Sequence, residues 1–172
     1  MHIKNKWIKL HYSNKVIFII FLLLLFSYSC ESKSKRKFDK QYMSITKFVD
    51  GDTFWVDDGS KKGLKIRLIG VNTPETIDPR KPVEFYGKEA SNYVKHLLAD
   101  KKVRLEYDID KIDRYGRTLA YVFLKDGTSL NADLIEKGYG RVMTVPPNVK
   151  YSEKFIELER KARENNIGLW KK

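Results

Sequence analysis

Cysteine and histidine are scarce in this sequence of 172 residues, which contains one cysteine and three histidines. A single cysteine, Cys30, excludes an internal disulfide, so a folded domain must be stabilised by its core alone. The scattered cysteine and histidines form no cluster of the kind that binds zinc. The apolar run over residues 16–26 is shorter than the about 20 residues of a membrane-spanning helix. No internal repeat is present.

The first 29 residues differ from the rest of the chain. Four lysines without any acid precede the apolar run, and small residues follow it, which is typical of a secretory signal peptide. Cys30 comes directly afterwards and resembles the lipid acceptor of a bacterial lipoprotein, although a plain cleaved signal peptide is the alternative. We predict a signal peptide over 1–29, a flexible tether over 30–40 and a folded domain over 41–172. The protein would be exported, either lipid-anchored in the cell envelope or secreted.

The chain is strongly basic, with a formal charge of +12. The lysines of residues 1–29 carry four of these charges, which leaves +8 on the exported part. A basic domain with ten tyrosines and nine phenylalanines in the chain suits a polyanionic partner, nucleic acid first. Surface lysines that only maintain solubility or contact anionic lipid are the alternative.

The hydrophobic pattern predicts five short strands and about three helices. Apolar and polar residues alternate in the third and fourth of these strands, and turn signals such as Asp50-Gly51 separate the strands. Helical spacing is found between the third and fourth strands and twice after the fifth strand. The predicted strands are 42–49, 54–56, 64–68, 103–107 and 118–124, and the predicted helices are 84–99, 131–137 and 152–165. This order is typical of an OB-fold five-stranded β-barrel with helices, an α+β domain.

The stretch from Ile66 to Glu75 organises the predicted site. Arg67 lies on the third strand, Gly70 interrupts the alternation, and Pro74 keeps Thr73 out of helical angles. A guanidinium and a carboxylate are thereby held near each other on rigid structure. In isolation, Arg67 would be an ordinary outward-facing strand residue and Glu75 a loop acid.

Oxygen ligands for a hard cation gather at predicted turns. The side chains of Asp50, Asp52, Asn72 and Glu75 and the carbonyl of Thr73 are of the type that calcium prefers. A second acidic set, Asp108, Asp110 and Asp113, lacks the glycine and terminal glutamate of an EF-hand loop. We interpret that set as a solvated turn whose shape depends on Asp113.

Two arginines and one acid complete the predicted chemistry. Phosphodiester hydrolysis builds negative charge on the phosphate oxygens, which guanidinium groups and a divalent ion offset. Arg67 and Arg117 lie at the margins of turns and are suited to this role. Glu75 is the candidate for the carboxylate that orients or deprotonates the attacking water.

Three ordered motifs resemble the staphylococcal nuclease (thermonuclease) family. They are Asp50-Gly-Asp52-Thr, Arg67-Leu-Ile-Gly-Val-Asn72-Thr73-Pro-Glu75 and Asp113-Arg-Tyr115-Gly-Arg117. The likeness continues through Glu84-Phe-Tyr86-Gly-Lys-Glu-Ala90, Leu119-Ala-Tyr121 and Gly168-Leu-Trp170, and spans residues 42–170 in one register.

The resemblance implies a calcium-dependent endonuclease on an OB barrel that cuts DNA and RNA and leaves 3′-phosphate ends. It implies that Asp52 and the Thr73 carbonyl bind calcium and that Glu75 is the general base. Arg67 and Arg117 would stabilise the transition state. The remaining implied contacts are with substrate: Arg114 and Tyr115 would touch the nucleotide, and the loop bearing Lys81 would flank the site.

Two positions depart from the family pattern. Asn72 stands where a second calcium-binding aspartate is expected; its amide oxygen can still bind calcium, with one charge fewer and weaker affinity. Thr144 stands where a second substrate-contacting tyrosine is expected. The metal set is then Asp52, Asn72, Thr73 and Glu75.

Two other functions are compatible with the sequence. A barrel that binds nucleic acid without cutting it is one, and Asn72 is its best support. A surface lipoprotein with an adhesive or structural role is the other. We expect a monomer, with DNA, RNA or both as substrate.

Overall fold

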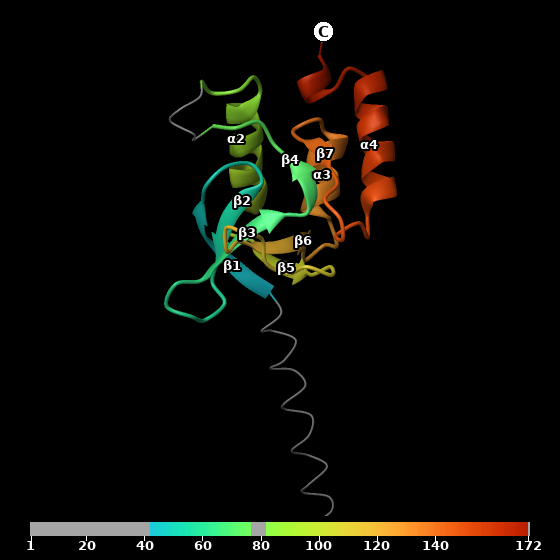
Figure 1. The fold of residues 1–172 in the computed structure, drawn as a ribbon. Coiled ribbons are helices and arrows are strands. Elements are labelled where there is room, and N and C mark those ends of the chain that lie inside the picture. Colours follow the sequence, from blue (N-terminus) through green and yellow to red (C-terminus); the bar gives the residue numbers. More distant parts are fainter. Residues whose placement is uncertain (1–41, 77–81, 172) are drawn as a thin grey trace, which may run out of the picture. The chain divides into compact units, whose positions relative to one another are not determined.

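The structure, a computed structural model, describes residues 42–76 and 82–171. The predicted signal peptide, Cys30, the tether and Lys81 lie outside the described residues. Five strands form a closed barrel in the order β1-β2-β3-β6-β5 (Figure 1). They are β1 (Tyr42–Phe48), β2 (Thr53–Val56), β3 (Leu64–Leu68), β5 (Lys102–Glu106) and β6 (Thr118–Leu124). The fold is the predicted OB-type barrel with helices.

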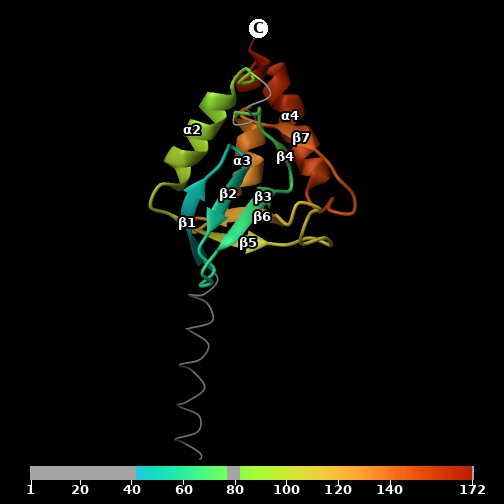
Figure 2. The same ribbon diagram turned by 60° about the vertical axis from the view of Figure 1, so that its left-hand side comes forward.

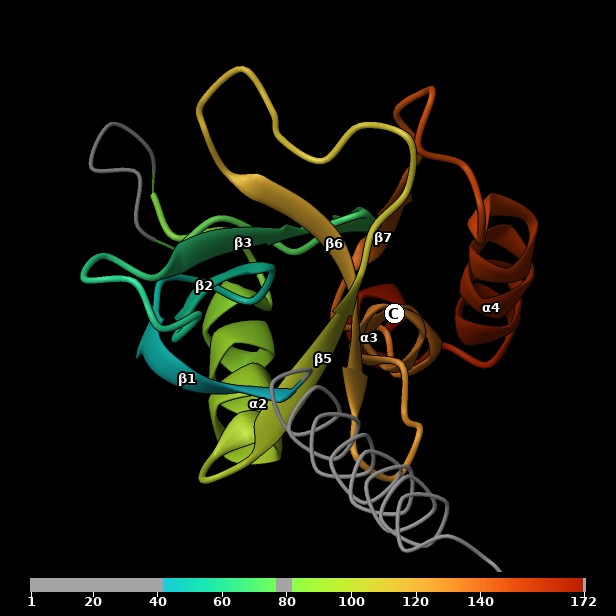
Figure 3. The same cartoon turned by 90° about the horizontal axis from the view of Figure 1, so that it is seen from below.

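Pairing within the barrel follows from the turns. Strands β1, β2 and β3 form an antiparallel meander, as predicted, and the Asp50-Gly51 turn joins the first two. Strands β3 and β6 are parallel, with Arg67 opposite Leu119, whereas β6 pairs antiparallel with β5, and β5 with β1. The view from below shows these five strands surrounding the barrel interior (Figure 3). The parallel pair brings the end of β3 beside the loop that precedes β6.

The alternating apolar residues of the strands fill the barrel. Side chains with no more than 1 % of their surface exposed come from β2, β3, β5 and β6, among them Phe54, Val56, Ile66, Leu68, Val103 and Val122. At about 25 cal/mol per Å² of apolar surface, burying one such side chain stabilises the fold by about 1.5–3 kcal/mol. This core holds the loops of the candidate site on a rigid base.

Three α-helices are present in the described part of the chain: α2 (Gly87–Leu98), α3 (Leu130–Glu136) and α4 (Ser152–Glu164). Helix α2 lies on one side of the molecule and α4 on the other, with α3 between them (Figure 2). Ser129 caps α3 by accepting a hydrogen bond from the Ala132 N–H at 3.3 Å. A 3₁₀ turn, Gly168–Trp170, follows α4. None of the described helices is long and apolar enough to span a membrane.

Most predicted boundaries agree with the structure to within one residue, and β6 agrees at both ends. The predicted start of α2, at Glu84, is three residues too early. Residues before Gly87 do not continue the helix because the Glu84 N–H donates to the Glu75 carbonyl at 3.0 Å and Tyr86 adopts a left-handed φ of 66°. This segment therefore supports the Glu75 loop instead of α2.

A second, two-stranded sheet was not predicted. Strand β4 (Gly70–Asn72) pairs antiparallel with β7 (Arg141–Met143). Gly70 has a φ of +76°, and a Cβ there would lie 2.7 Å from the Phe155 ring, so glycine permits both the bend and the contact. The prediction of a plain turn after β3 was wrong, because three residues are too few to show a strand pattern.

Candidate active site

Arg67 is the centre of a buried polar cluster at the end of β3. Only 6 % of its surface is exposed, and its Nη2 lies 3.2 Å from Oδ2 of Asp52. Nη1 donates to the carbonyls of Leu68 at 2.9 Å and Val71 at 2.6 Å, and Nη2 donates to Oδ1 of Asn72 at 2.9 Å. Burial lowers the pKa of Arg67, the Asp52 carboxylate opposes that change, and Arg117 lowers the pKa further. Both Nη groups thus have protein partners.

Asp52 joins the β1–β2 turn to the segment after β4. It is 5 % exposed, and its Oδ2 accepts from the Thr73 N–H at 2.9 Å while Oδ1 accepts from the Thr53 hydroxyl. The two segments approach closely because residue 51 is glycine: a Cβ there would lie 2.9 Å from the Thr73 side chain. The structure thereby brings together Asp52, Asn72 and Thr73, three of the four predicted metal ligands.

Asp50 is the most perturbed acid of this cluster. Burial, reinforced by the neighbouring Asp52 carboxylate, raises the pKa of Asp50 to about 7. Its Oδ1 accepts from the Asp52 N–H at 3.1 Å. The guanidinium of Arg67 already balances Asp52, and a cation bound beside Asp50 would favour the ionised form of Asp50.

The donor set suits a hard cation. All of its atoms are oxygens, and the buried hydroxyl of Thr73 has no hydrogen-bond partner in the structure. Within residues 42–76 and 82–171, no three His, Cys, Asp or Glu side chains are grouped as a metal centre, so a cation here would also need amide, carbonyl or water ligands. The side chains fit calcium in their chemistry, with Asp52 as the main charged ligand.

Glu75 follows this cluster by two residues. Its Oε1 accepts from the Thr76 N–H at 2.8 Å, and its own N–H donates to Oε2 of Glu84 at 3.3 Å. It belongs to the loop that carries the cluster, but it is not among the described residues that line the pocket beside Arg67. Its role as base remains a prediction.

Arg117 is held by the loop before β6. Asp113 accepts from the Arg117 Nε at 2.7 Å and from the backbone N–H groups of Arg117 and Tyr115 at 2.9 Å. Burial alone would raise the pKa of Asp113, but these hydrogen bonds outweigh it and lower the pKa. The interpretation of Asp113 as the residue that shapes this turn agrees with these contacts.

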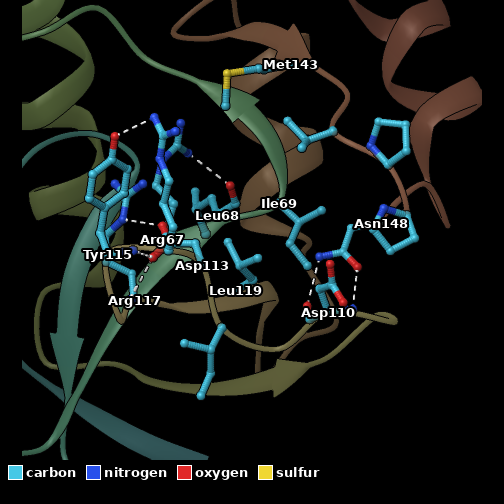
Figure 4. A pocket seen from close by; sticks show the side chains of 16 residues that line it. Arg67, Leu68, Ile69, Asp110, Asp113, Tyr115, Arg117, Leu119, Met143 and Asn148 are labelled. Atoms are coloured by element: carbon cyan, nitrogen blue, oxygen red, sulfur yellow. Dashed lines mark hydrogen bonds and ion pairs between the residues drawn. The ribbon is translucent and has the colours of Figure 1, made fainter.

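The two arginines line one pocket of about 510 Å³ (Figure 4). Arg67, Arg117, Asp113 and Tyr115 gather on one side of it, and Asp110 and Asn148 lie on the other. Arg114 also lines this pocket; it donates to the Tyr115 hydroxyl at 2.6 Å, and the Arg117 guanidinium lies 5.5 Å from the centre of the Tyr115 ring. The structure therefore places Arg114 and Tyr115 together with the two arginines. Lys81 lies outside the described residues.

The far wall of the pocket was not predicted. Met143, Val145, Pro146, Pro147 and Asn148 form it, and Thr144 does not line the pocket. Its two neighbours, Met143 and Val145, line the pocket instead. Asn148 is 5 % exposed and exchanges two hydrogen bonds of 2.8 Å with the backbone of Asp110, which ties this wall to the opposite loop. The Pro-Pro-Asn sequence is a turn signal that could have drawn attention to this wall.

The closed barrel and the pocket lined by Arg67 and Arg117, with the oxygen cluster beside Arg67, define an OB-fold protein with a basic pocket. A family model described as staphylococcal nuclease homologue matches residues 65–172. The chain is 44% identical over 133 residues to a thermonuclease of Staphylococcus hyicus, covering 77% of each chain. It is 43% identical over 129 residues to a thermonuclease of Staphylococcus intermedius, covering 74% of this chain and 75% of that protein.

A third relative is the endonuclease YncB of Bacillus subtilis (strain 168). The identity is 38% over 143 residues, which are 82% of this chain and 66% of that protein. The chain belongs to the staphylococcal nuclease homologue family. It is a nuclease, and therefore a phosphodiester hydrolase.

Proposed function

We propose that this nuclease is a calcium-dependent endonuclease that hydrolyses phosphodiester bonds of DNA, RNA or both and leaves 3′-phosphate ends. The main support is that Arg67 and Arg117 line one pocket while the oxygens of Asp52 and Asn72 meet at Arg67. A phosphate in this pocket would face two permanent positive charges held by the barrel. Such fixed charges lower the free energy of a transition state that gains negative charge.

The arginines have different roles in this proposal. Arg117 is the more exposed and has one carboxylate partner, Asp113, so its remaining N–H groups are suited to bind phosphate oxygens. Arg67 is buried and both of its Nη groups bind protein oxygens. It therefore contributes to the positive electrostatic potential of the pocket and holds Asp52 in place.

Asp52, Asn72, Thr73 and Glu75 are the residues that would hold calcium. When bound, the ion would supply positive charge opposite the phosphate and polarise an attacking water molecule. Asp52 provides a carboxylate already fixed by two hydrogen-bond donors, and Asn72 an uncharged amide oxygen. Glu75 would accept the proton of the attacking water, because it is the acid next to this cluster in the same loop.

The cleavage assay uses the full-length chain with end-labelled single-stranded DNA and RNA. We expect products with calcium and none with a chelator. Products with 3′-phosphate ends would become extendable by terminal transferase only after phosphatase treatment. Glu75→Gln should abolish cleavage, whereas the matched Glu136→Gln, an exposed acid at the end of α3, should leave it unchanged. Cleavage that persists in chelator, or in Glu75→Gln, would contradict the proposal.

We also propose that the protein is exported and that Cys30 carries a lipid. The basic and apolar sequence before Cys30 supports this. Cells expressing the chain and supplied with labelled fatty acid should incorporate the label, and Cys30→Ser should not. Release of unlabelled wild-type protein into the medium would favour a cleaved signal peptide without an anchor. We expect the exported domain to be monomeric, which light scattering tests.

A further inference from the structure

Phe85 is the most exposed phenylalanine or tyrosine in the part of the chain that the structure describes, with 71 % of the residue's surface accessible. Tyr115, beside Arg117 in the pocket, is second at 68 %. A phenyl ring left in water gains nothing from burial, so its exposed position beside the loop of the candidate base is informative. We propose that Phe85 stacks on a base of the substrate strand, in a nucleotide subsite beside the Glu75 loop and outside the arginine pocket. This proposal rests on the proposed function.

Phe85 is fixed next to Glu75 by the backbone. The Glu84 N–H donates to the Glu75 carbonyl at 3.0 Å, and the Glu75 N–H donates to the Glu84 carboxylate at 3.3 Å. These two hydrogen bonds join the segment before α2 to the loop of the candidate base. A base stacked on Phe85 would belong to a nucleotide close to the reacting phosphate.

A row of tyrosines supports the ring from behind. Phe85 lies 5.7 Å from Tyr86 between ring centres, Tyr86 lies 5.6 Å from Tyr139, and Tyr139 stacks on Tyr93 at 4.3 Å and 15°. The inner faces of this row are covered by neighbouring rings, and Lys137 lies over Tyr93 at 5.2 Å. Phe85 is therefore the end of the row that presents a ring to a ligand.

The backbone at Tyr86 is strained in order to build this arrangement. Its φ of 66° lies in the left-handed region, which is unfavourable for a bulky residue. The following Gly87 leaves room for Thr76, whose Cγ2 would lie 2.8 Å from a Cβ at that position. The strain holds Phe85 outside α2 and against the loop of Glu75.

Positive charge for the strand backbone lies next to this segment. A groove of about 310 Å³ is lined by Thr76, which follows Glu75, and by Lys88, Ser91, Asn92 and Lys95 of α2. These four residues share one face of α2, because Ser91, Asn92 and Lys95 follow Lys88 by three, four and seven positions. Within residues 42–76 and 82–171, neither lysine forms an ion pair. Two unpaired lysines in a groove suit the phosphate that follows the stacked base.

Binding to a short fluorescent oligothymidylate, measured by anisotropy on the full-length chain in a Glu75→Gln background, tests the stacking contact. Base–aromatic stacking is worth about 1–3 kcal/mol, so Phe85→Ala should weaken binding by about fivefold to a hundredfold. Phe85→Trp should retain affinity and Phe85→Leu should lose most of it, because leucine keeps the apolar surface without a ring face. The control is Ile156→Ala, which removes another exposed apolar side chain, on α4.

Two further measurements separate recognition of the base from recognition of the phosphate. The first uses a series of oligonucleotides that each carry one abasic site at a different position. We expect the Glu75→Gln protein to bind more weakly only to the oligonucleotide whose abasic site falls at the Phe85 subsite. Adding Phe85→Ala should abolish this dependence on position. The second measures the salt dependence of binding by the double variant Lys88→Gln/Lys95→Gln. The slope of log affinity against log salt should become less steep by about 0.7 for each phosphate that these lysines neutralise in the unmodified protein.

The possible failures are distinguishable. If the wild-type chain neither cleaves nor binds oligonucleotide, the proposed function is wrong. If it does both, while Phe85→Ala and Phe85→Leu bind like Ile156→Ala, the subsite alone is overturned. If Phe85→Ala destabilises the protein and lowers its melting temperature, binding by Phe85→Leu and by the abasic series decides whether the subsite exists.

Discussion

Arg67 and Asp52 form a buried ion pair, with 3.2 Å between Nη2 and Oδ2 and no more than 7 % of either side chain exposed. The pair joins β3 to the turn between β1 and β2, and Asp52 in turn holds the Thr73 backbone. The same two side chains thus position the loop of the candidate site and supply its charges. Stability and activity are therefore coupled at this pair.

Arg67→Ala should be strongly destabilising, because it leaves the Asp52 carboxylate buried without its partner. We expect a loss of about 3–5 kcal/mol in the free energy of unfolding, measured with urea. Arg67→Lys should cost less, because it keeps the charge, yet it loses the fork of donors to Leu68, Val71 and Asn72. Arg160→Ala, which breaks exposed ion pairs on α4, is the control and should have little effect. Equal stability of Arg67→Ala and Arg160→Ala would contradict this expectation.

Arg117→Lys should reduce activity with little change in stability. Its partner Asp113 lies in a surface loop, so the ion pair contributes less than about 1 kcal/mol to folding. Loss of the guanidinium should lower kcat by about a hundredfold to a thousandfold if Arg117 stabilises the transition state. Asp113→Asn should have a smaller effect on kcat, since it loosens the side chain of Arg117 without removing it. A change in KM alone would assign Arg117 to binding.

Asn72→Asp should increase calcium affinity. The substitution adds a negative charge beside Asp52, and the carboxylate can still accept the hydrogen bond from Arg67. We expect about a tenfold tighter calcium dissociation constant by isothermal titration calorimetry, and cleavage at correspondingly lower calcium. Asn165→Asp at the end of α4 adds the same charge far from the site and serves as the control. Unchanged calcium binding in Asn72→Asp would remove residue 72 from the ligand set.

Asp50 should make the calcium-free protein less stable as the pH rises. In the folded state the pKa of Asp50 is raised from 3.8 to about 7. Between pH 3.8 and 7, Asp50 is therefore protonated in the folded protein and ionised in the unfolded protein, so unfolding releases a proton. The free energy of unfolding falls across this pH range and levels off above pH 7. Asp50→Asn should remove this loss, on the order of 2 kcal/mol at pH 8, given about 1.4 kcal/mol per pKa unit and partial solvation. Urea unfolding of both proteins in chelator at several pH values gives the difference. A difference that is constant with pH would show that Asp50 titrates normally.

Asn148 should couple the two loops that enclose the pocket. Its buried amide both accepts from and donates to the Asp110 backbone, so Asn148→Ala leaves two backbone groups without partners. We expect a loss of about 1–3 kcal/mol in stability and a higher KM, because the apolar wall around Val145 is no longer fixed. Asn148→Asp keeps the acceptor and loses the donor, and should be intermediate. A variant that loses stability with unchanged KM would limit Asn148 to a structural role.

Much of the fold follows from local pattern. The alternation of apolar and charged residues over 64–68 predicts β3, and the apolar run over 118–124, which ends before Asp126-Gly127, predicts β6. The start of α2 and the short sheet of β4 and β7 could not be predicted in this way. The segment before α2 is bound by the Glu75 loop, and Gly70–Asn72 becomes a strand only because Arg141–Met143 lies beside it. Both depend on partners distant in the sequence.

The candidate site likewise has features that the sequence predicts and features that depend on distant segments of the chain. The sequence by itself determined the chemistry: which arginines and carboxylates are present, on which turns, and in an order that resembles the staphylococcal nuclease family. The tertiary structure alone decided that Arg67 and Arg117 share a pocket, that Asp50 is buried enough to hold its proton near neutral pH, and that Met143, Val145 and Phe85 are displayed near the site. The physical reason is that charge strength and burial depend on what surrounds a group, and the surroundings come from segments that only the closed barrel brings together.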